Sequence, residues 1–475
     1  MLFNSFTFLF FFPIVCMVYY ALPGLRLRNL FLLAASYYFY MNWEPVYALL
    51  LLASTGITYI AALGCARYER KKKAILVLGI AVNLLILFFF KYFNFAAENV
   101  AAVMKLFGIG MTIPEFKVLL PVGISFYIFQ ALGYMIDVYR GDVKAEKDFF
   151  TYALFVSFFP QLVAGPIERS TSLLPQFYEK HKFNAENAIN GLNLMLWGFF
   201  LKLVVADRCA IYVDAVYNNI QYHHGSSILL ASCLYCFQVY GDFAGYSYIA
   251  IGSSRIMGFK IMDNFRRPYF FSTSIQDFWK RNHISLTSWF MDYVYYPMIG
   301  SSTKLWWWCF SIFITFFISG FWHGASWTYV WSFSIMGFYL VICTIKDQKQ
   351  RAFEKKYGLK KKGWWLWLNR IVTFFLVMYA WVYFRASTLS DALYASTEMC
   401  TNMLSRPFLN DVNHLLYAFF ALFILFVTEY CIENKKITVN ASNSLRVYTL
   451  SSIALIVLIL NLGIFNGGQF IYFQF

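Results

Sequence analysis

Long apolar stretches recur along the whole of this 475-residue chain and are separated by short polar segments. An α-helix crosses the hydrocarbon core of a bilayer with about 20 consecutive apolar residues, and most of the stretches reach or approach that length. The pattern therefore predicts an all-α, polytopic membrane protein with about eleven transmembrane helices. The clearest spans are residues 3–22, 46–63, 74–90, 305–319, 374–384, 415–428 and 448–462.

The apolar pattern of residues 118–300 is repeatedly broken by proline and by acidic residues. Backbone breaks and charges are tolerated at membrane depth only where protein or a water-filled cavity surrounds them. We therefore expect a single transmembrane domain over residues 1–475, with a catalytic interior at 118–345 and peripheral spans at 1–95 and 364–475. The interrupting residues are Pro121, Asp137, Pro160, Pro166, Glu168, Asp242, Asp263, Pro268 and Asp277.

Composition supports the membrane assignment, because only 13% of the residues are charged and 60% are hydrophobic. The net charge of +15 does not indicate nucleic-acid binding, since Lys and Arg gather in short loops, where they set orientation. We expect the densest basic runs, residues 69–73 and 346–362, in the cytoplasm and the N-terminus outside. Binding of anionic lipid headgroups is an open alternative for both runs. The first apolar segment lacks a basic leader and should be retained as a span.

His323 is the sharpest candidate for chemistry, because it follows the apolar run at residues 305–319. An ionisable residue at such depth is a functional hypothesis by default. Gly320 and Gly324 permit close helix packing around it, and Trp322 adds an apolar wall. A desolvated imidazole stays neutral and can act as a general base toward an alcohol. A structural role, in which the imidazole bonds a backbone carbonyl and holds two helices together, is the open alternative.

His283 is the second histidine in apolar surroundings, and it follows a basic pair, Lys280 and Arg281, with one residue between. With Trp279, these residues form a candidate binding site for a phosphate-bearing acyl donor on the cytoplasmic side. The open alternative is that these charges only set the orientation of the chain in the membrane. The other histidines lie in polar loops, where solvation accounts for them: His181, His223, His224 and His414.

Further candidate site residues are Asp242, Asp292, Trp289 and Trp322. The two carboxylates have an ordinary pKa near 4 and are therefore weaker bases than a neutral histidine. The sequence contains no Gly-x-Ser-x-Gly elbow and no phosphate-binding glycine loop, which disfavours a serine esterase and an ATP-driven pump. No His, Cys and Asp set has the spacing of a metal site.

A series of motifs in fixed order resembles the membrane-bound O-acyltransferase (MBOAT) family, in its bacterial branch typified by the alginate O-acetylation protein. The resemblance covers nearly the whole chain. Besides the segments around His283 and His323, its motifs are Leu120-Pro-Val-Gly-Ile-Ser-Phe-Tyr-Ile-Phe-Gln130, Asp137-Val-Tyr-Arg140, Phe159-Pro-Gln-Leu-Val-Ala-Gly-Pro-Ile-Glu-Arg169, Ala206-Asp-Arg208, Gln238-Val-Tyr-Gly-Asp-Phe-Ala-Gly-Tyr-Ser247, Asn264-Phe-Arg-Arg-Pro-Tyr269, Trp381-Val-Tyr-Phe-Arg-Ala386 and Phe470-Ile-Tyr-Phe-Gln-Phe475.

The resemblance implies a ring of spanning helices around a thin centre, with a funnel on each side that meets the other at the histidines. It implies that His323 is catalytic and that His283 is the second polar residue of the site. The implied location is the inner membrane of a bacterial cell. No bound cofactor is implied; an acyl thioester, acetyl-CoA or an acyl carrier, is the donor substrate, presented from the cytoplasm.

The implied acceptor is a hydroxyl of an extracytoplasmic polysaccharide, or an esterase-like acetyltransferase partner that modifies the polysaccharide. Within the family, D-alanyl transfer to teichoic acid from a carrier protein is the alternative. A transporter or flippase is the alternative of another class, although such proteins often show repeated halves and this sequence shows none. A membrane scaffold would not explain why charges concentrate in the middle third.

Overall fold

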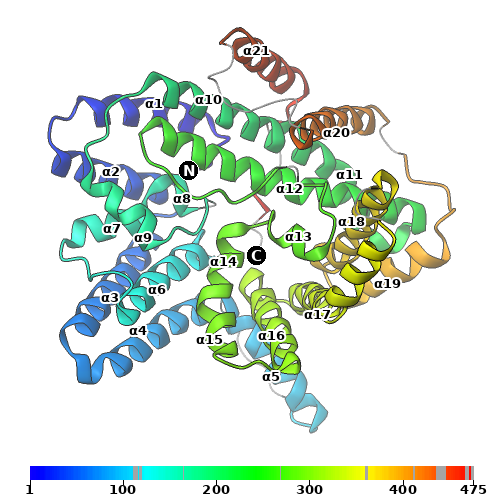
Figure 1. Ribbon diagram of the computed structural model, residues 1–475, viewed down its shortest axis with the longest axis horizontal. Coiled ribbons are helices and arrows are strands. Elements are labelled where there is room, and N and C mark those ends of the chain that lie inside the picture. Colours follow the sequence, from blue (N-terminus) through cyan, green and yellow to red (C-terminus); the bar gives the residue numbers. More distant parts are fainter. Residues whose placement is uncertain are drawn as a thin grey trace. The chain divides into compact units, whose positions relative to one another are not determined.

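All regular structure in the described part of the chain is helical, as the apolar pattern predicts (Figure 1). The computed structural model describes residues 1–475 except 111–115, 117–119, 164, 268, 359–361, 410–411, 435–444, 466–469 and 472–475. The side chains of residues 347–352 and 445–448 are likewise not described. Pro268, parts of the basic run 346–362 and the last four residues of the C-terminal motif therefore lie outside the described residues.

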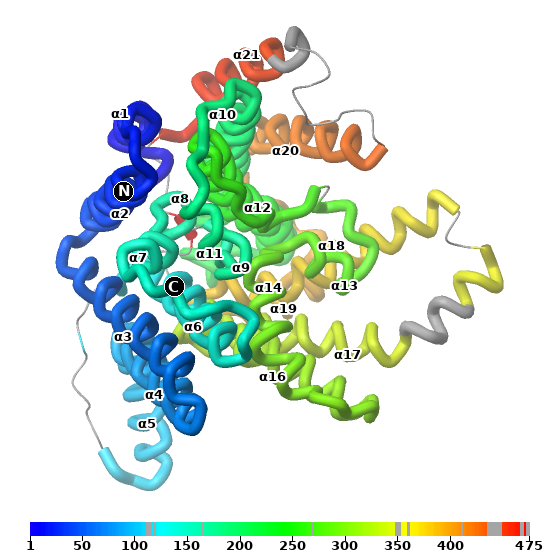
Figure 2. The backbone as a smooth tube through the Cα atoms, turned by 60° about the vertical axis from the view of Figure 1, so that its left-hand side comes forward, coloured from blue at the N-terminus to red at the C-terminus, as the bar shows by residue number. Residues whose placement is uncertain are grey.

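The helices form two compact units. The first comprises Met1–Leu192 with Ala250–Met262, and the second comprises Asn193–Ile249 with Asp263–Phe475. The single domain expected from the sequence stays a prediction. In the first unit, α3, α4 and α6 lie side by side (Figures 1 and 2). Its helices are α1 (Phe6–Ala21), α2 (Leu25–Met41), α3 (Tyr47–Arg67), η1 (Glu69–Lys71), α4 (Lys72–Leu87), η2 (Phe88–Tyr92), α5 (Phe93–Leu106), α6 (Ile124–Arg140), α7 (Phe149–Ser157), α8 (Phe159–Leu162), α9 (Ser170–Leu173), η3 (Leu174–Tyr178) and the first part of α10 (Ala185–Phe199).

The second unit carries both candidate histidines. Within it, η4 is a π-helical turn, a feature that often marks functional sites. Its helices are the end of α10, η4 (Phe200–Ala206), α11 (Asp207–Tyr217), η5 (Ile220–Tyr222), most of α12 (Gly225–Ile256), α13 (Ile275–Trp279), α14 (Ile284–Phe290), η6 (Met291–Tyr295), α15 (Tyr296–Ile299), α16 (Leu305–His323), α17 (Trp327–Lys356), α18 (Gly363–Arg385), α19 (Leu389–Thr401), α20 (Val412–Glu433) and α21 (Leu445–Leu462).

Among the described residues, eight helical segments are long and apolar enough to cross a membrane, and two apolar helices, Phe6–Ala21 and Thr449–Leu462, are shorter. A multi-pass membrane protein is confirmed, whereas the expected number of about eleven crossings is not. Several helices of the interior, such as α13 and α14, are too short to span. The eight segments are Tyr47–Arg67, Glu69–Leu106, Ala185–Tyr217, Gly225–Ile256, Leu305–His323, Trp327–Lys346, Gly363–Arg385 and Val412–Glu433.

Small residues bring the helices of the second unit into backbone contact. A methyl group at Gly198 of α10 would lie 2.6 Å from the carbonyl oxygen of Gly245 in α12. The α16–α17 hairpin is equally close, since a methyl group at Gly320 would lie 2.8 Å from Cα of Val330. Lipid supplies little hydrophobic drive for helix association, so such close packing is the main source of stability between spans. The glycine at 320 thus has the packing role that the sequence indicates.

The α17–α18 hairpin contains the basic run 346–362 and fixes the expected orientation. If this run is cytoplasmic, the end of α18 and the whole of α19 face the opposite side. Of the nine cysteines, all of which are described, Cys400 of α19 alone is exposed.

We expect a membrane-impermeant maleimide to modify native Cys400 in sealed, right-side-out vesicles. Cys400→Ser should abolish the labelling. In that background, Lys355→Cys, at an exposed position near the end of α17, should react only after the vesicles are permeabilised. Modification of Lys355→Cys in sealed vesicles would contradict the orientation and with it the position of the N-terminus outside.

Candidate active site

The structure brings the two candidate histidines together, although 40 positions separate them. His323 is the last residue of α16, and His283 directly precedes α14. Their ring centroids are 6.3 Å apart with the ring planes at 71°. Each side chain is only 3% exposed. The two imidazoles are therefore close enough to act on neighbouring atoms of one bound group.

Aromatic side chains enclose His323. Its ring stacks on Phe333 of α17 with centroids 4.1 Å apart. Phe384 of α18 approaches edge-on at 5.6 Å, and Trp322 at 4.8 Å. The ring of Tyr329 lies against Gly324, where a side chain would collide with it. These rings exclude water from the imidazole, which strengthens the electrostatic interactions that it makes with a bound group.

His283 has an unusual backbone conformation. Its φ of 46° lies in the left-handed region, and it is the one non-glycine residue with positive φ among those described. Such conformations cost about 1–3 kcal/mol and persist where the surroundings enforce them, often at active sites. Burial lowers the pKa of His283 well below its usual value, so the imidazole is neutral at physiological pH.

Asn264 holds His283 in place and fixes its tautomer. Nδ1 of His283 lies 3.1 Å from Oδ1 of Asn264, an acceptor, so the proton resides on Nδ1 and Nε2 is the basic nitrogen. The same oxygen accepts a hydrogen bond from Oγ of Ser285 at 2.9 Å, and Nδ2 of Asn264 donates to Ser247 at 3.1 Å. The backbone oxygen of Asn264 accepts from Ile284 N. Asn264 is fully buried.

The sequence reasoning missed the role of Asn264. The one available signal was its place at the start of the Asn264–Tyr269 motif, in a stretch of interior residues broken by charge. A single asparagine in such a segment does not indicate which side chain it contacts.

The three candidate donor-binding residues differ in their surroundings. Lys280 is exposed. Arg281 is paired with Asp277, with Nε 3.0 Å from Oδ1. Trp279 is buried and packs on Phe333 at 5.8 Å, so it belongs to the aromatic wall near His323 and does not face the solvent. Of the three, Lys280 is therefore the most accessible to a phosphate group.

The remaining candidates lie in three places. Trp322 lies 5.8 Å from the ring of His283, within the histidine site. Trp289 is buried and contacts Tyr293 at 4.9 Å, and Asp292 lies three residues beyond it on η6, partly exposed. Asp242 belongs to a different cluster.

Asp242 is part of a buried ionic cluster around Lys202. Nζ of Lys202 lies 2.6 Å from Oδ1 of Asp242 and 2.8 Å from Oδ1 of Asp207. Oδ2 of Asp242 accepts a hydrogen bond from the backbone N–H of Ile471 at 2.6 Å. The cluster therefore anchors the C-terminal segment. The sequence reasoning missed Lys202, although a lysine inside an apolar span is itself a functional signal.

A cavity of about 250 Å³ adjoins this cluster. Its lining comes from α11, α12, the start of α17 and the end of α18, and it includes all three ionic residues together with Phe384 and Arg385. Because Phe384 also contacts His323, one aromatic ring separates the cavity from the histidine site.

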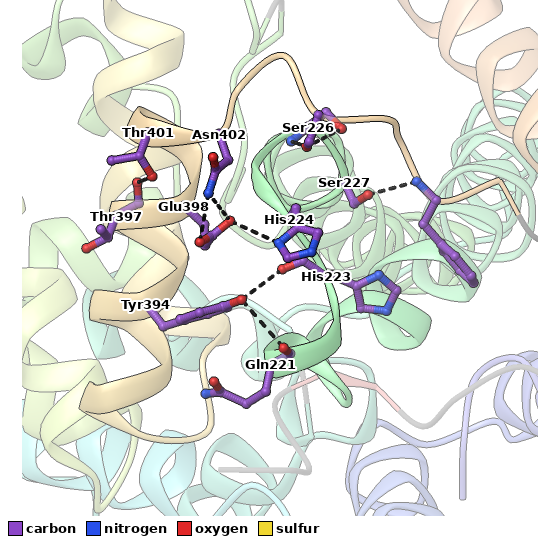
Figure 3. A network of polar contacts seen from close by, with 12 residues as sticks. Gln221, His223, His224, Ser226, Ser227, Tyr394, Thr397, Glu398, Thr401 and Asn402 are labelled. Carbon is purple, nitrogen blue, oxygen red and sulfur yellow. Dashed lines mark hydrogen bonds and ion pairs between the residues drawn. The ribbon is translucent and has the colours of Figure 1, made fainter.

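A polar network on α19 fixes that helix to the connection between α11 and α12 (Figure 3). Nδ1 of His224 lies 3.3 Å from Oε2 of Glu398, and Tyr394 donates to the carbonyl oxygen of His223 at 3.2 Å. His224 is exposed, as expected for a polar loop. His223 is not solvated as expected: it is 9% exposed and packs on Phe408 at 4.8 Å, because the chain after α19 folds over it.

Comparison with known proteins matches the sequence model of the membrane-bound O-acyltransferase family to residues 145–389, which include both histidines. The chain is 35% identical to a Pseudomonas putida protein named probable alginate O-acetylase AlgI, over the full length of both. It is 31% identical to the peptidoglycan O-acetyltransferase of Helicobacter pylori, over 100% of this chain and 98% of the relative. Identity to the teichoic acid D-alanyltransferase of Bacillus subtilis is 28%, over 55% of this chain and 68% of the relative.

The lowered pKa of His283 predicts a pH-dependent stability. Below about pH 6.5, the ordinary histidine value, the unfolded chain binds a proton that the folded protein refuses, so the free energy of unfolding falls as the pH falls. We expect the melting temperature of the purified protein to decrease from pH 7 downward, and His283→Asn to flatten this dependence. Asparagine tolerates positive φ and keeps an N–H for Asn264. An equal slope in both proteins would contradict the prediction.

Proposed function

This chain belongs to the membrane-bound O-acyltransferase family, and on that basis we propose that it moves an acetyl group from a cytoplasmic thioester to a hydroxyl group on the other side of the membrane. That it is a membrane acyltransferase follows from the family. The observation that carries the finer proposal is the pair of buried histidines, 6.3 Å apart, inside the matched segment.

In the proposed reaction, His323 is the general base. It removes the proton from the acceptor hydroxyl as the oxygen attacks the thioester carbonyl. The carbon–sulfur bond breaks, the thiolate leaves, and the proton passes from His323 to the sulfur, so the imidazole is neutral again at the end. A positioned base contributes about 10² to 10⁴ in rate. Nε2 of His283 accepts a hydrogen bond from a donor group of the acceptor other than the reacting hydroxyl, whose one proton goes to His323. His283 thereby positions the acceptor, because Asn264 holds its ring still.

The donor is acetyl-CoA or an acyl carrier, which reaches the site from the cytoplasmic side past Lys280. The acceptor is an extracytoplasmic polysaccharide, or an esterase-like partner that modifies it, in the inner membrane of a bacterial cell. The names of two full-length relatives, an alginate O-acetylase and a peptidoglycan O-acetyltransferase, support acetyl transfer toward a polysaccharide. Similarity to the D-alanyltransferase covers only 55% of this chain, which favours acetyl over D-alanyl. The family assignment also disfavours a transporter or flippase.

His323→Ala should abolish acetyl transfer, with a loss of about 10² to 10⁴ in rate. The measurement is thiol release from acetyl-CoA by the purified protein in lipid nanodiscs. His223→Ala is the matched control, because it removes a buried imidazole that packs on Phe408 outside the site, and it should keep its activity. His283→Ala should be damaging but leave a remnant. If His323→Ala kept more than about a tenth of the normal rate, the general-base role would be wrong.

Lys280→Gln should raise the KM for acetyl-CoA about two- to fivefold at an unchanged kcat, as expected for an exposed charge that helps to bind a phosphate. Arg281 is less suitable for this test, since its replacement also releases Asp277. Lys355→Gln, an exposed lysine near the end of α17, is the control for a general loss of basic charge. An unchanged KM in Lys280→Gln would place the donor elsewhere.

A further inference from the structure

The cavity beside Phe384 lies at the start of α17 and the end of α18, which are the ends of these two helices opposite to the basic run 346–362. Its lining includes Thr328 at the start of α17 and Arg385 at the end of α18. With residues 346–362 in the cytoplasm, both ends are extracytoplasmic. From this placement we infer that the cavity is the acceptor subsite of the proposed reaction and that it takes an uncharged sugar residue. The inference rests on the proposed function and specifies the acceptor.

The cavity reaches the histidine site through a single layer of rings. Phe384 lines the cavity, and its centroid lies 5.6 Å from that of His323 and 4.9 Å from that of Tyr329, which also lines it. Rotation of the Phe384 side chain would bring a hydroxyl in the cavity up to the imidazole. An acceptor therefore needs to travel only the thickness of one side chain.

The charges of the lining disfavour an acidic acceptor. Among the described residues, the lining contains two cations, Lys202 and Arg385, and three carboxylates, so that carboxylates outnumber cations. Both cations already have anionic partners: Lys202 has Asp207 and Asp242, and Arg385 has Asp214 at 2.7 Å. A uronate or phosphate would meet more carboxylates than cations, and each of these cations already has an anionic partner, so the charge of such a ligand would be poorly compensated.

The polar groups suit a ligand that donates several hydrogen bonds. Oδ2 of Asp207 and Oε1 of Gln238 accept none from the described residues, and both side chains line the cavity. Asp207 is only 5% exposed, so its second oxygen depends on a ligand or water for a donor. Sugar hydroxyls supply such donors, and the lining also includes an aromatic residue, Tyr235.

The volume limits the ligand to a small group. At about 250 Å³, the cavity is below the roughly 300–1,000 Å³ of pockets that enclose drug-sized ligands. It has room for one sugar residue, with the rest of the glycan outside. If the acceptor were instead a serine side chain of a partner protein, its single hydroxyl would leave most of this polar lining without a hydrogen-bond donor.

The test is saccharide binding by protein in nanodiscs, carried out in the His323→Ala background so that no transfer occurs. The probes are a β-1,4-linked glucose tetrasaccharide and a β-1,4-linked mannuronate tetrasaccharide of equal length. We expect the neutral probe to bind at least tenfold more tightly. Gln238→Leu should weaken its binding about fivefold, the effect of one hydrogen bond. Gln221→Leu is the matched control, because this exposed amide does not line the cavity, donates to Asp391 at 3.0 Å and should leave binding unchanged.

Asp214→Asn provides a gain of function. It removes the carboxylate partner of Arg385 and so supplies a cation to the cavity. The ratio of the affinities for the neutral and the uronate probe should fall about tenfold, the effect of a charge-assisted hydrogen bond.

Equal or tighter binding of the uronate by the parent protein, binding of neither saccharide, or tighter binding of a serine-containing peptide would each overturn the inference. A different result would separate the two proposals. If His323→Ala still transferred the acetyl group and kept its preference for the neutral saccharide, the general-base role of His323 would be wrong, and the acceptor subsite would stand.

Discussion

A polar group inside the hydrocarbon core finds no hydrogen-bond partner in the lipid, so the chain itself has to provide one. The second unit meets this constraint at three buried sites. Lys202 lies between two carboxylates. Glu429 of α20 is fully buried and accepts hydrogen bonds from the hydroxyl of Tyr240 and the backbone N–H of Phe270. Asn264 connects the segment before α13 to the start of α14. Each site joins segments that are far apart in the sequence, so satisfying the polar groups also fixes the arrangement of the interior.

The same constraint accounts for the properties of His283. Irregular backbone at membrane depth has to be surrounded by protein. The described residues between 263 and 283 are irregular on both sides of the short helix α13, and they are anchored at Asn264, at the Arg281–Asp277 pair and through Phe270 on Glu429. These anchors hold His283 at a positive φ that an isolated histidine would avoid. The strained backbone, the neutral imidazole and the proton on Nδ1 thus have one cause. In the proposed reaction this means that Nε2 is in place before any substrate binds.

The class of fold and the two histidines were predictable from the sequence, because both rest on the cost of polar groups in lipid. Apolar runs of spanning length stand out without an alignment, and so does an imidazole such as His323 at the end of one. The number of crossings was not predictable to the same degree, since interior helices such as α13 and α14 are short. Whether a side chain points to the solvent or into the protein was harder still to predict. Trp279 follows a polar segment and precedes two basic residues, yet its ring packs inward on Phe333. Which side chains form ion pairs was hardest to predict, because nothing in the sequence links Lys202 to Asp242, 40 residues away.

Transfer between the two faces of a membrane requires a barrier that is thin at one place and closed elsewhere. Aromatic rings suit this requirement, because they fill space densely yet turn about two side-chain torsions without disturbing a helix. The rings of Phe333, Phe384 and Trp322 pack around His323 from two spans and from its own helix. Turning Phe384 alone would open the imidazole toward the cavity while Phe333 and Trp322 kept the opposite side closed. A base placed behind one movable ring can therefore meet an acceptor from one face without creating a continuous aqueous path, which is what separates an acyl-transfer site from a channel built of the same helices.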